Sequence, residues 1–441
     1  MKSVDFYYDF VCPYAYLGHT QIEAVCARAG AELRWRPFLL GGVFKAIGTP
    51  EGPAAAMSPA KARLNLLDMR RWADHFGVPL VMPPTHPNRT VLALRAAVAA
   101  AEPIGGAPES ADAPARAAKA LFHAYWALGQ DISNPSVVAE TLDAAGFDGA
   151  ALCARAEAPE IKVALRVRTD IAVEAGVFGA PTCVVHAPGA EGELFWGQDR
   201  LHLVEKALSG KSGPSAEAAP LERAHSTSPA GAEGAPAWKH LDFFFDFSSP
   251  FAYLAATQIE VVAARHGARL RYRPFLLGGL FKAIGAPNVP MFAFPAAKQR
   301  HYGLDMVRWA DSWGVPFRQA SRFPMNTVKP LRMVLALPED QRGPLIAAIY
   351  KAYWALDRDI SDEAELAAIA AAAGYDPAPL VAATSDAAIK AQLHTETEAA
   401  RAAGVCGAPS FLVGRLLFWG QDRLHFVEKA LEGWIPPGEE G

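Results

Sequence analysis

The chain has 441 residues, of which 51% are hydrophobic and 20% are charged. This is ordinary globular composition, and the length is sufficient for two or more domains. The formal net charge of −4 at pH 7 gives no basic excess, so neither nucleic acid nor an anionic membrane is expected as a partner. The start lacks a signal-peptide run and no apolar stretch reaches about 18 residues, so we expect a cytoplasmic protein without a membrane span.

The cysteines and histidines argue against two common kinds of site. The five cysteines are odd in number and irregularly spaced, and no two of them form a CxxC pair. A disulfide framework is therefore not expected. The 12 histidines show no HxxxH or HxH grouping, so we also expect no metal site.

The chain contains one sequence unit written twice. "DFVCPYAYLGHTQIE" at Asp9 returns as "DFSSPFAYLAATQIE" at Asp246. "FWGQDRLHLVEKAL" at Phe195 returns as "FWGQDRLHFVEKAL" at Phe418. The spacing between the copies shortens twice, in segments rich in Gly, Pro and Ala, which we interpret as surface loops lengthened in the first copy.

A compositional break separates the two copies. Ala, Gly, Pro and Ser dominate residues 209–239, where large apolar side chains are scarce. Such a segment cannot bury much surface, so we predict a flexible or semi-extended linker. The chain is therefore predicted to be a tandem fusion of two whole domains, at about 1–208 and 240–434.

Each copy opens with a strand, a helix and a second strand. The aromatic-rich runs "VDFYYDF" and "LDFFFDF" are typical of strands, and the periodic segments that follow predict helices over about 13–29 and 250–266. Both helices begin with a proline, which places Cys12 and Ser249 at the N-cap. The alternating runs "AELRWRPF" and "ARLRYRPF" predict the second strand.

The middle of each copy is a helical insert, at about 50–175 and 287–403. After Gly-Ala-Pro come a short apolar strand, a second strand ending in "LFW" and a closing helix near "GQDRLH". The first strand pair is parallel if the helix is a crossover, whereas the final pair can be a hairpin. The predicted fold class is α/β, with two tandem thioredoxin-like domains that each carry a large α-helical insertion.

Four motifs occur in the same order in both copies. They are D-F-x-[SC]-P-[FY]-x-Y-L after the first strand, "FKAIG" after the second, Gly-Ala-Pro before the third, and W-G-Q-D-R-L before the last helix. Together they resemble the kappa-class glutathione transferase and 2-hydroxychromene-2-carboxylate isomerase branch of the DsbA-like thioredoxin superfamily. The resemblance covers both copies but not the linker. The form of the last motif and the lysine in "FKAIG" favour the isomerase.

The resemblance implies glutathione as the cofactor, with Ser249 as the group that stabilises its thiolate. An unperturbed thiol has a pKa of about 8.5 and is mostly protonated at neutral pH. A serine hydroxyl that donates a hydrogen bond at the N-terminal end of a helix favours the anion. The nucleophile is then the sulfur of the cofactor. The alternative is that Ser249 is only a helix N-cap.

Cys12 occupies the same place in the first copy, and three interpretations compete. Cys12 replaces serine as the thiolate-stabilising group, forms a mixed disulfide with glutathione, or marks a copy that has lost activity. A thiol at this place is expected to have a depressed pKa. The second cysteine of a CxxC pair is replaced by Ala15, so dithiol exchange is not expected.

The same resemblance makes Pro181 and Pro409 cis-prolines. They would turn the backbone of Ala180 and Ala408 toward the site, where N–H and C=O can pair with the main chain of glutathione. The alternative is an ordinary trans proline in a turn. The residues that follow the nucleophile position also belong to the implied glutathione site: Pro13, Tyr14, Pro250 and Phe251.

Two Asp-Arg pairs precede the closing helices, Asp199-Arg200 and Asp422-Arg423. In the family this pair meets the γ-glutamyl end of glutathione, where a carboxylate can bind the ammonium and an arginine the carboxylate. The alternative is that each aspartate only caps a helix.

Further lysines and an asparagine are implied as ligand contacts. Lys61 and Lys298 correspond to a family lysine that meets the glycyl carboxylate of glutathione. Asn288 is a further glutathione contact, and its counterpart Glu51 would place a negative charge near an anionic ligand.

The "FKAIG" motif carries Lys45 and Lys282, which are candidates to hold the carboxylate of the substrate. The alternative is a pair of solvated surface lysines. The repeated "AYW" motifs place Trp126 and Trp354 on amphipathic helices, where we expect them in the core.

The implied reaction is glutathione-dependent conversion of a 2-hydroxychromene-2-carboxylate, a small aromatic carboxylate, into trans-o-hydroxybenzylidenepyruvate during aromatic degradation. Three alternatives stay open: a kappa-class transferase or peroxidase, a monothiol oxidoreductase that uses Cys12, and a glutathione-binding pseudoenzyme. Single-copy relatives form dimers, so we expect the two copies to pair as an intramolecular pseudo-dimer.

Overall fold

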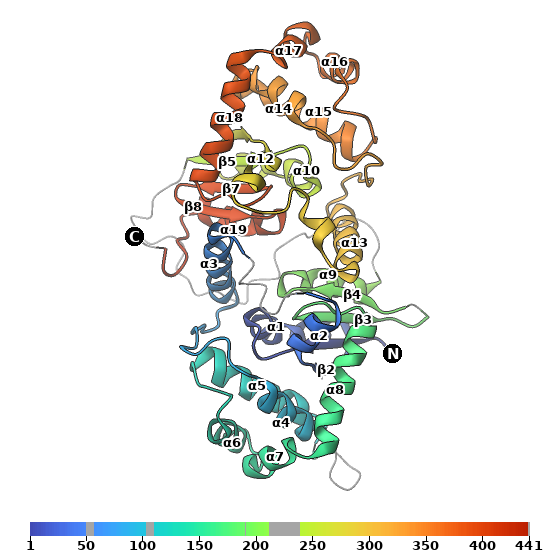
Figure 1. Cartoon of the computed structure of the whole chain (residues 1–441), viewed down its shortest axis with the longest axis vertical. Helices are drawn as coiled ribbons and strands as arrows, with labels where there is room; N and C mark the ends of the chain where they lie inside the picture. The colour runs from blue at the N-terminus through green and yellow to red at the C-terminus, as the bar shows by residue number, and fades with distance from the viewer. Residues whose placement is uncertain (50–56, 103–109, 190, 211–238, 440–441) are drawn as a thin grey trace.

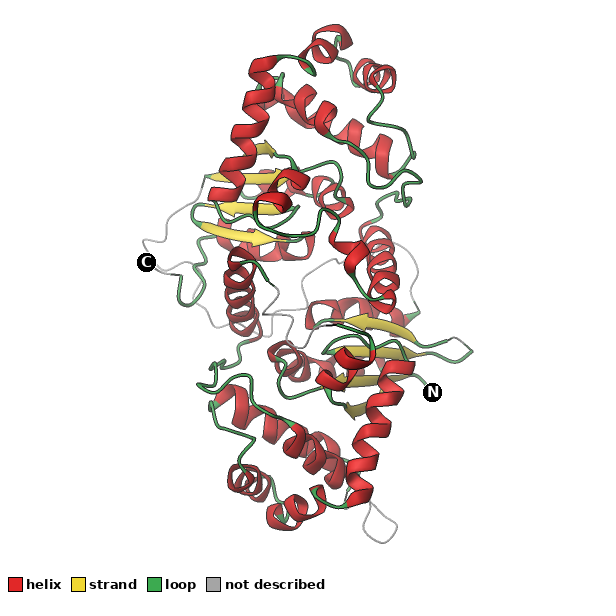
Figure 2. Cartoon of the chain, in the orientation of Figure 1, coloured by secondary structure: helices red, strands yellow, loops and turns green. Residues whose placement is uncertain are grey.

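Each copy, called repeat 1 and repeat 2 below, contains a four-stranded mixed sheet (Figure 2). The structure is a computed structural model that describes residues 1–49, 57–102, 110–189, 191–210 and 239–439. The linker predicted over 209–239 lies, apart from its ends, outside these residues.

The strand order follows the predicted β-α-β and β-β-α parts of each repeat. In repeat 1, β1 pairs in parallel with β2 and antiparallel with β3, which pairs antiparallel with β4. Repeat 2 has the same pattern in the order β6-β5-β7-β8. The strands are β1 (Ser3–Tyr8), β2 (Glu32–Pro37), β3 (Thr182–His186), β4 (Glu193–Trp196), β5 (His240–Phe245), β6 (Arg269–Pro274), β7 (Ser410–Val413) and β8 (Leu416–Trp419).

Helices fill the predicted inserts and close each repeat. In repeat 1 they are α1 (Pro13–Ala29), α2 (Leu40–Ala46), α3 (Pro59–Phe76), α4 (Val91–Ala101), α5 (Ala113–Phe122), the π-helix η2 (His123–Ala127), α6 (Pro135–Ala144), α7 (Gly149–Ala156), α8 (Pro159–Glu174), the 3-10 helix η3 (Gln198–Arg200) and α9 (Leu201–Ser209). In repeat 2 they are α10 (Pro250–Ala256), α11 (Ile259–Arg265), α12 (Leu277–Ala283), α13 (Ala296–Trp313), α14 (Val328–Leu335), α15 (Arg342–Trp354), α16 (Glu363–Ala372), α17 (Pro377–Ala383), α18 (Ala387–Ala402) and α19 (Leu424–Leu431), with 3-10 turns η4 (Pro290–Ala293), η5 (Glu339–Gln341) and η6 (Gln421–Arg423).

One predicted helix is divided. The segment expected to be helical over 250–266 forms α10 and α11, whereas α1 is continuous. At the break, the N–H groups of Thr257 and Gln258 donate to the carbonyls of Leu254 and Ala255, each three residues back, at 3.2 and 3.0 Å. A 3-10 turn therefore interrupts the α-helical pattern there.

Both faces of the repeat 1 sheet are covered by helices. Adjacent residues of a strand point to opposite faces. Phe6 of β1 lies against Gly18 of α1, while Tyr7 shares a groove with Val167 of α8. The helix α1 and the helix α8 therefore lie on opposite faces of the sheet.

The two "AYW" tryptophans belong to the core, as predicted. Trp126 in η2 and Trp354 at the end of α15 are fully buried. Their indole N–H groups donate to the carbonyls of Phe10 and Phe247, at 2.7 and 2.8 Å. Each indole thus ties the helical insert to the segment between the first strand and the first helix.

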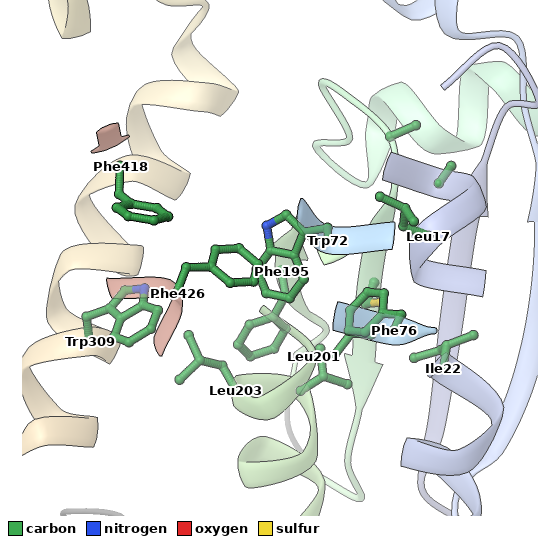
Figure 3. Close-up of a cluster of buried hydrophobic side chains, with 14 of the residues drawn as sticks. Leu17, Ile22, Trp72, Phe76, Phe195, Leu201, Leu203, Trp309, Phe418 and Phe426 are labelled. Carbon is green, nitrogen blue, oxygen red and sulfur yellow. The ribbon is translucent and has the colours of Figure 1, made fainter. Parts of the chain in front are cut away.

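The repeats pack against one another through equivalent helices. Figure 1 shows α3 of repeat 1 beside α19, and α13 of repeat 2 beside α9 and β4; α3 also contacts β8. Apolar side chains from both repeats form one buried cluster between them (Figure 3). The rings of Trp72 and Phe426 lie 5.1 Å apart across this boundary. Burial of each large apolar side chain contributes about 1.5–3 kcal/mol, so the shared cluster is a strong reason for the repeats to stay together.

In the part of the chain that the structure describes, no helix is both long and apolar enough to cross a bilayer. All five cysteines are unpaired. Among the described residues, no group of three or more His, Cys, Asp or Glu side chains is arranged to hold a metal ion.

Candidate active site

Ser249 forms the first part of the site in repeat 2. It is the N-cap of α10, and its hydroxyl accepts a hydrogen bond from the N–H of Ala252 at 3.1 Å. The same hydroxyl donates to the carbonyl of Ala408 at 2.8 Å. The capping role is therefore real, but it leaves the hydroxyl hydrogen directed at the loop before Pro409.

Cys12 forms the equivalent contact in repeat 1. Its thiol donates to the carbonyl of Ala180 at 3.0 Å. Burial raises the pKa of Cys12 to about 12, although the backbone N–H groups of Ala15 and Tyr14 lower it in part. The expectation of a depressed thiol pKa was wrong, because desolvation of the charged form outweighs the N–H groups of the first helical turn.

The loops that receive these hydrogen bonds have the expected cis peptides, Ala180–Pro181 and Ala408–Pro409. The glycine before each of them lies directly against a tryptophan. A Cβ atom on Gly179 or Gly407 would stand 2.5 Å from the indole nitrogen of Trp196 or Trp419. Only glycine fits there without displacing the ring, so each tryptophan is part of the wall of the site.

The candidate glutathione lysines lie across the boundary between the repeats. The ammonium of Lys61 is 5.3 Å from the ring centroid of Trp419, and that of Lys298 is 5.1 Å from the ring centroid of Trp196. Both distances are typical of cation–π contacts. Lys61 of repeat 1 therefore borders the Ser249 site, and Lys298 of repeat 2 borders the Cys12 site.

Lys298 is the more enclosed of the two lysines. Its ammonium also lies 4.2 Å from the ring centroid of Phe294. Burial, together with the positive charge of Lys61, lowers the pKa of Lys298 to about 8. A considerable neutral fraction is therefore present at the upper end of the physiological pH range.

Arg423 joins three aspartates from both repeats. It donates two hydrogen bonds to Asp68 of α3, at 2.7 and 2.9 Å. It also binds Asp199 at 2.8 Å and its own neighbour Asp422 at 3.1 Å. Its side chain is almost fully buried, so the arginine predicted to meet glutathione is already engaged at the inter-repeat boundary.

Arg200 makes the equivalent set of contacts. It donates two hydrogen bonds to Asp305 of α13, each 2.9 Å long, and it lies 2.8 Å from Asp422 and 3.0 Å from Asp199. Each arginine thus binds the aspartate of the opposite repeat, which is the reciprocal pattern of a two-fold interface. The network made by Asp68, Asp199, Arg200, Asp305, Asp422 and Arg423 is called the axial charge cluster below.

The axial charge cluster holds more carboxylates than guanidinium groups. Burial raises the pKa of Asp422, and Arg423 and Arg200 oppose this increase only in part. Burial acts in the same direction on Asp199, but Arg200 and Arg423 hold its pKa below the usual value. The four carboxylates of the cluster thus share only two guanidinium groups.

The residues after the nucleophile positions differ between the repeats. The Tyr14 hydroxyl donates to the side-chain oxygen of Asn65 at 2.9 Å. In repeat 2 the phenylalanine ring of Phe251 meets the ring of Tyr302 edge to face, with centroids 5.0 Å apart. The tyrosine hydroxyl is thus carried by α1 in repeat 1 and by α13 in repeat 2. Pro13 and Pro250 occupy the first helical position, as predicted.

The remaining predicted contacts that lie in the described residues are exposed. Lys45 and Lys282 are exposed near the ends of α2 and α12. Asn288 is exposed, with its side-chain oxygen 2.9 Å from the Cβ position of Gly278. Its counterpart Glu51 lies outside the described residues.

The sequence motifs did not indicate Asp68 and Asp305, which the structure places in the axial charge cluster. Both occur in a repeated L-D-M-x-R-W-A-D motif. Asp9, whose role the sequence leaves open, is buried and accepts hydrogen bonds from the Thr90 hydroxyl at 2.7 Å and the Leu40 N–H at 2.9 Å. Burial raises the pKa of Asp9, and its hydrogen bonds connect the segment after β1 to α2 and to the residue before α4.

Comparison with known proteins places these features in a family. A family model described as a DSBA-like thioredoxin domain matches residues 3–209 and again 240–432. A 2-hydroxychromene-2-carboxylate isomerase of Sphingobium xenophagum is 31% identical over 193 residues, which is 44% of this chain and 98% of that protein. The glutathione S-transferase kappa 1 of Caenorhabditis elegans is 27% identical, over 47% of this chain and 91% of that protein.

Among solved structures, a 2-hydroxychromene-2-carboxylate isomerase matches with a TM-score of 0.40 and 28% identity, covering 47% of this chain and 95% of that chain. Each of these relatives corresponds to about half of the chain, whereas the family model matches both halves. The chain therefore belongs to the DSBA-like thioredoxin domain family and carries two copies of that domain in tandem.

Proposed function

We propose that the chain is a glutathione-dependent isomerase that converts 2-hydroxychromene-2-carboxylates into trans-o-hydroxybenzylidenepyruvates. The observation that carries this proposal is the Ser249 hydroxyl, held 2.8 Å from the Ala408 carbonyl beside Pro409 and bordered by Trp419. Two relatives named 2-hydroxychromene-2-carboxylate isomerase each match about half of the chain.

Glutathione would supply a thiolate that adds to the conjugated carbon of the opened substrate, allows the former double bond to rotate and leaves unchanged. Ser249 would give up its bond to Ala408 and donate its hydrogen to that sulfur. The freed carbonyl of Ala408 would then accept an N–H from the main chain of glutathione. The protein thus stabilises and orients a nucleophile without forming a covalent bond itself.

The ends of glutathione fit the charges found around each site. Lys61 at the Ser249 site, and Lys298 at the Cys12 site, would hold the glycyl carboxylate. The axial charge cluster has four aspartates for two arginines, so the ammonium of a γ-glutamyl group would supply the missing positive charge. Asn288 remains a candidate contact, and Lys282 and Lys45 remain candidate anchors for the carboxylate of the substrate.

The tandem arrangement is proposed to act as an intramolecular pseudo-dimer. Each nucleophile position is bordered by a lysine from the opposite repeat, so neither site would be complete in an isolated domain. Fusion would keep both halves at a high effective concentration. The boundaries 1–208 and 240–434 are retained as the proposed domain limits.

The product mass tests the reaction type. An isomerase returns a product with the mass of the substrate, whereas a conjugating transferase, the second function that the kappa-class relative suggests, adds the mass of glutathione. We expect the isomer to accumulate only when glutathione is present, and Ser249→Ala to slow its formation. A stable glutathione conjugate, or isomerisation that does not depend on glutathione, would refute the proposed reaction.

A further inference from the structure

Repeat 1 has a groove between α8 and the sheet, outside the candidate active site. The groove has a volume of about 390 Å³. Tyr7 and Arg36 line it from the sheet, and Val167, Arg168 and Ile171 line it from α8. This volume lies within the range of about 300–1,000 Å³ that is usual for small-molecule sites.

The α8 side of the groove is apolar and faces solvent. Val163, Val167 and Ile171 are 47%, 45% and 48% exposed, and their spacing of four residues places them on one face of the helix. The opposite face of α8 carries Leu165 and Ala172, which are buried in the core. An apolar stripe of this kind beside a cavity is a typical feature of a binding surface.

Two arginines provide the polar part of the groove. Arg168 makes one hydrogen bond to Glu102 at 2.7 Å, and both side chains are partly exposed. Arg36 binds Asp5 at 2.9 Å, and Asp5 also lies 3.0 Å from a ring nitrogen of His186. Partly exposed ion pairs contribute about 0–1 kcal/mol, so an incoming carboxylate can replace Glu102 on Arg168 at little cost.

Repeat 2 shows that the apolar stripe is not required by the fold. The helices α8 and α18 have the same register, because Thr169 and Thr397 each accept an N–H, from Leu39 and Leu276, at 3.0 Å. At the positions equivalent to the stripe, α18 carries Ala391, Thr395 and Ala399. The fold therefore forms without large apolar side chains there.

The charge at the equivalent position is also reversed. Glu396 stands where repeat 1 has Arg168, and it binds Arg273, the counterpart of Arg36, at 2.8 Å. In repeat 2 the arginine of the sheet is thus already paired with a glutamate of the helix. In repeat 1 the exchange of glutamate for arginine adds a cation beside an apolar wall.

We propose that this groove binds a small organic acid with an aromatic or branched apolar body. The body lies against Val167 and Ile171, and the carboxylate binds Arg168. The groove is on the face of the sheet covered by α8, whereas Cys12 begins α1 on the opposite face. The ligand therefore does not compete with a ligand of the candidate active site, and the proposal does not depend on the proposed reaction.

The test uses 2-naphthoate as the probe and titration calorimetry on the full chain. Arg168→Glu installs the residue of repeat 2 and should weaken the binding of 2-naphthoate about tenfold or more, the loss expected for a charged hydrogen bond. Ile171→Thr should weaken it as well. Lys162→Glu, the same charge change elsewhere on α8, should leave binding unchanged, and so should saturating glutathione.

Each of the other outcomes overturns the proposal. They are no binding of 2-naphthoate to the wild type, equal binding by Arg168→Glu and Lys162→Glu, and displacement of the probe by glutathione. A concentration-dependent dimer that Ile171→Thr abolishes would instead assign the face to a second copy of the chain. Thermal melting of each variant shows whether it is folded. If Arg168→Glu does not fold, the effect of Ile171→Thr on the binding of 2-naphthoate decides the test.

Discussion

Arg423 of repeat 2 holds Asp68 of repeat 1 with two hydrogen bonds, at 2.7 and 2.9 Å. The pair is almost fully buried and is repeated by Arg200 and Asp305 on the other side of the boundary. The residues predicted to bind glutathione at the ends of the two repeats are therefore positioned by the opposite repeat. The properties of one site depend on the folding and charge of both.

Asp68→Asn should destabilise the chain strongly. The change replaces one of the two oxygens that accept hydrogen bonds from Arg423 with an N–H₂ donor. A buried donor left without an acceptor costs about 1–3 kcal/mol, and more when the donor is charged. The free energy of unfolding in urea measures the effect. Arg401→Ala, which breaks the exposed pair with Glu398, is the control and should cost less than about 1 kcal/mol. Equal losses for the two variants would show that the axial charge cluster does not hold the repeats together.

Stability should fall as the pH is lowered from about 6.5 to 4. Burial lowers the pKa of His75 to about 3, and that of His19, His202 and His301 to about 4. These rings are neutral in the folded chain, whereas the unfolded chain binds protons below its pKa of about 6.5. Each ring can therefore remove up to about 1.4 kcal/mol of stability per pH unit in this window.

Thermal melting between pH 8 and pH 4.5 measures this loss. His75→Gln should make the decline less steep, because that side chain takes up no proton on unfolding. His240→Asn changes an exposed histidine and serves as the matched control. A melting temperature that does not vary between pH 6.5 and 4.5 would contradict the burial of neutral histidines.

Glutathione affinity at the Cys12 site should decrease above about pH 8. The pKa of Lys298 is lowered to about 8 by burial and by the charge of Lys61, so its positive charge is present below this value and lost above it. Lys298→Arg keeps the charge and should remove the decrease. Calorimetric affinities at pH 7 and pH 9 in both proteins decide the matter, and an identical pH dependence would exclude Lys298 as the carboxylate ligand.

Cys12 should react slowly with alkylating reagents. Only the thiolate reacts, and burial raises the pKa of Cys12 to about 12. We expect iodoacetamide to modify Cys12 in the folded chain at pH 7.5 at least about tenfold more slowly than in the unfolded chain. Peptide mass spectrometry measures both rates. Rapid modification in the folded chain would restore the interpretation of Cys12 as a redox nucleophile.

The order of elements could be read from the sequence because both copies give the same signals. The aromatic strands, the prolines at 13 and 250, and the repeated "LFW" each match an element in both repeats. The break between α10 and α11 could not be predicted, because the periodicity continues through Thr257. It arises from local hydrogen bonds that leave no compositional signal.

The site was only partly predictable for a different reason. Motifs show which residues lie at helix ends, so Cys12, Ser249 and the two cis-prolines fall where the sequence indicated. The motifs do not show which copy a side chain will face, and thus Lys61 and Asp68 could not be assigned to the opposite repeat. The prediction of a lowered pKa for Cys12 was wrong, because the extent to which burial removes water from the thiol depends on packing.

Titration of glutathione into the wild type, Ser249→Ala and Cys12→Ala by calorimetry tests the central claim most directly. If each repeat contributes residues to both sites, we expect two binding events in the wild type. Ser249→Ala should weaken one of them, and Cys12→Ala should weaken the other. Absence of glutathione binding, or binding that Ser249→Ala leaves unchanged, would contradict the assignment of this site to glutathione.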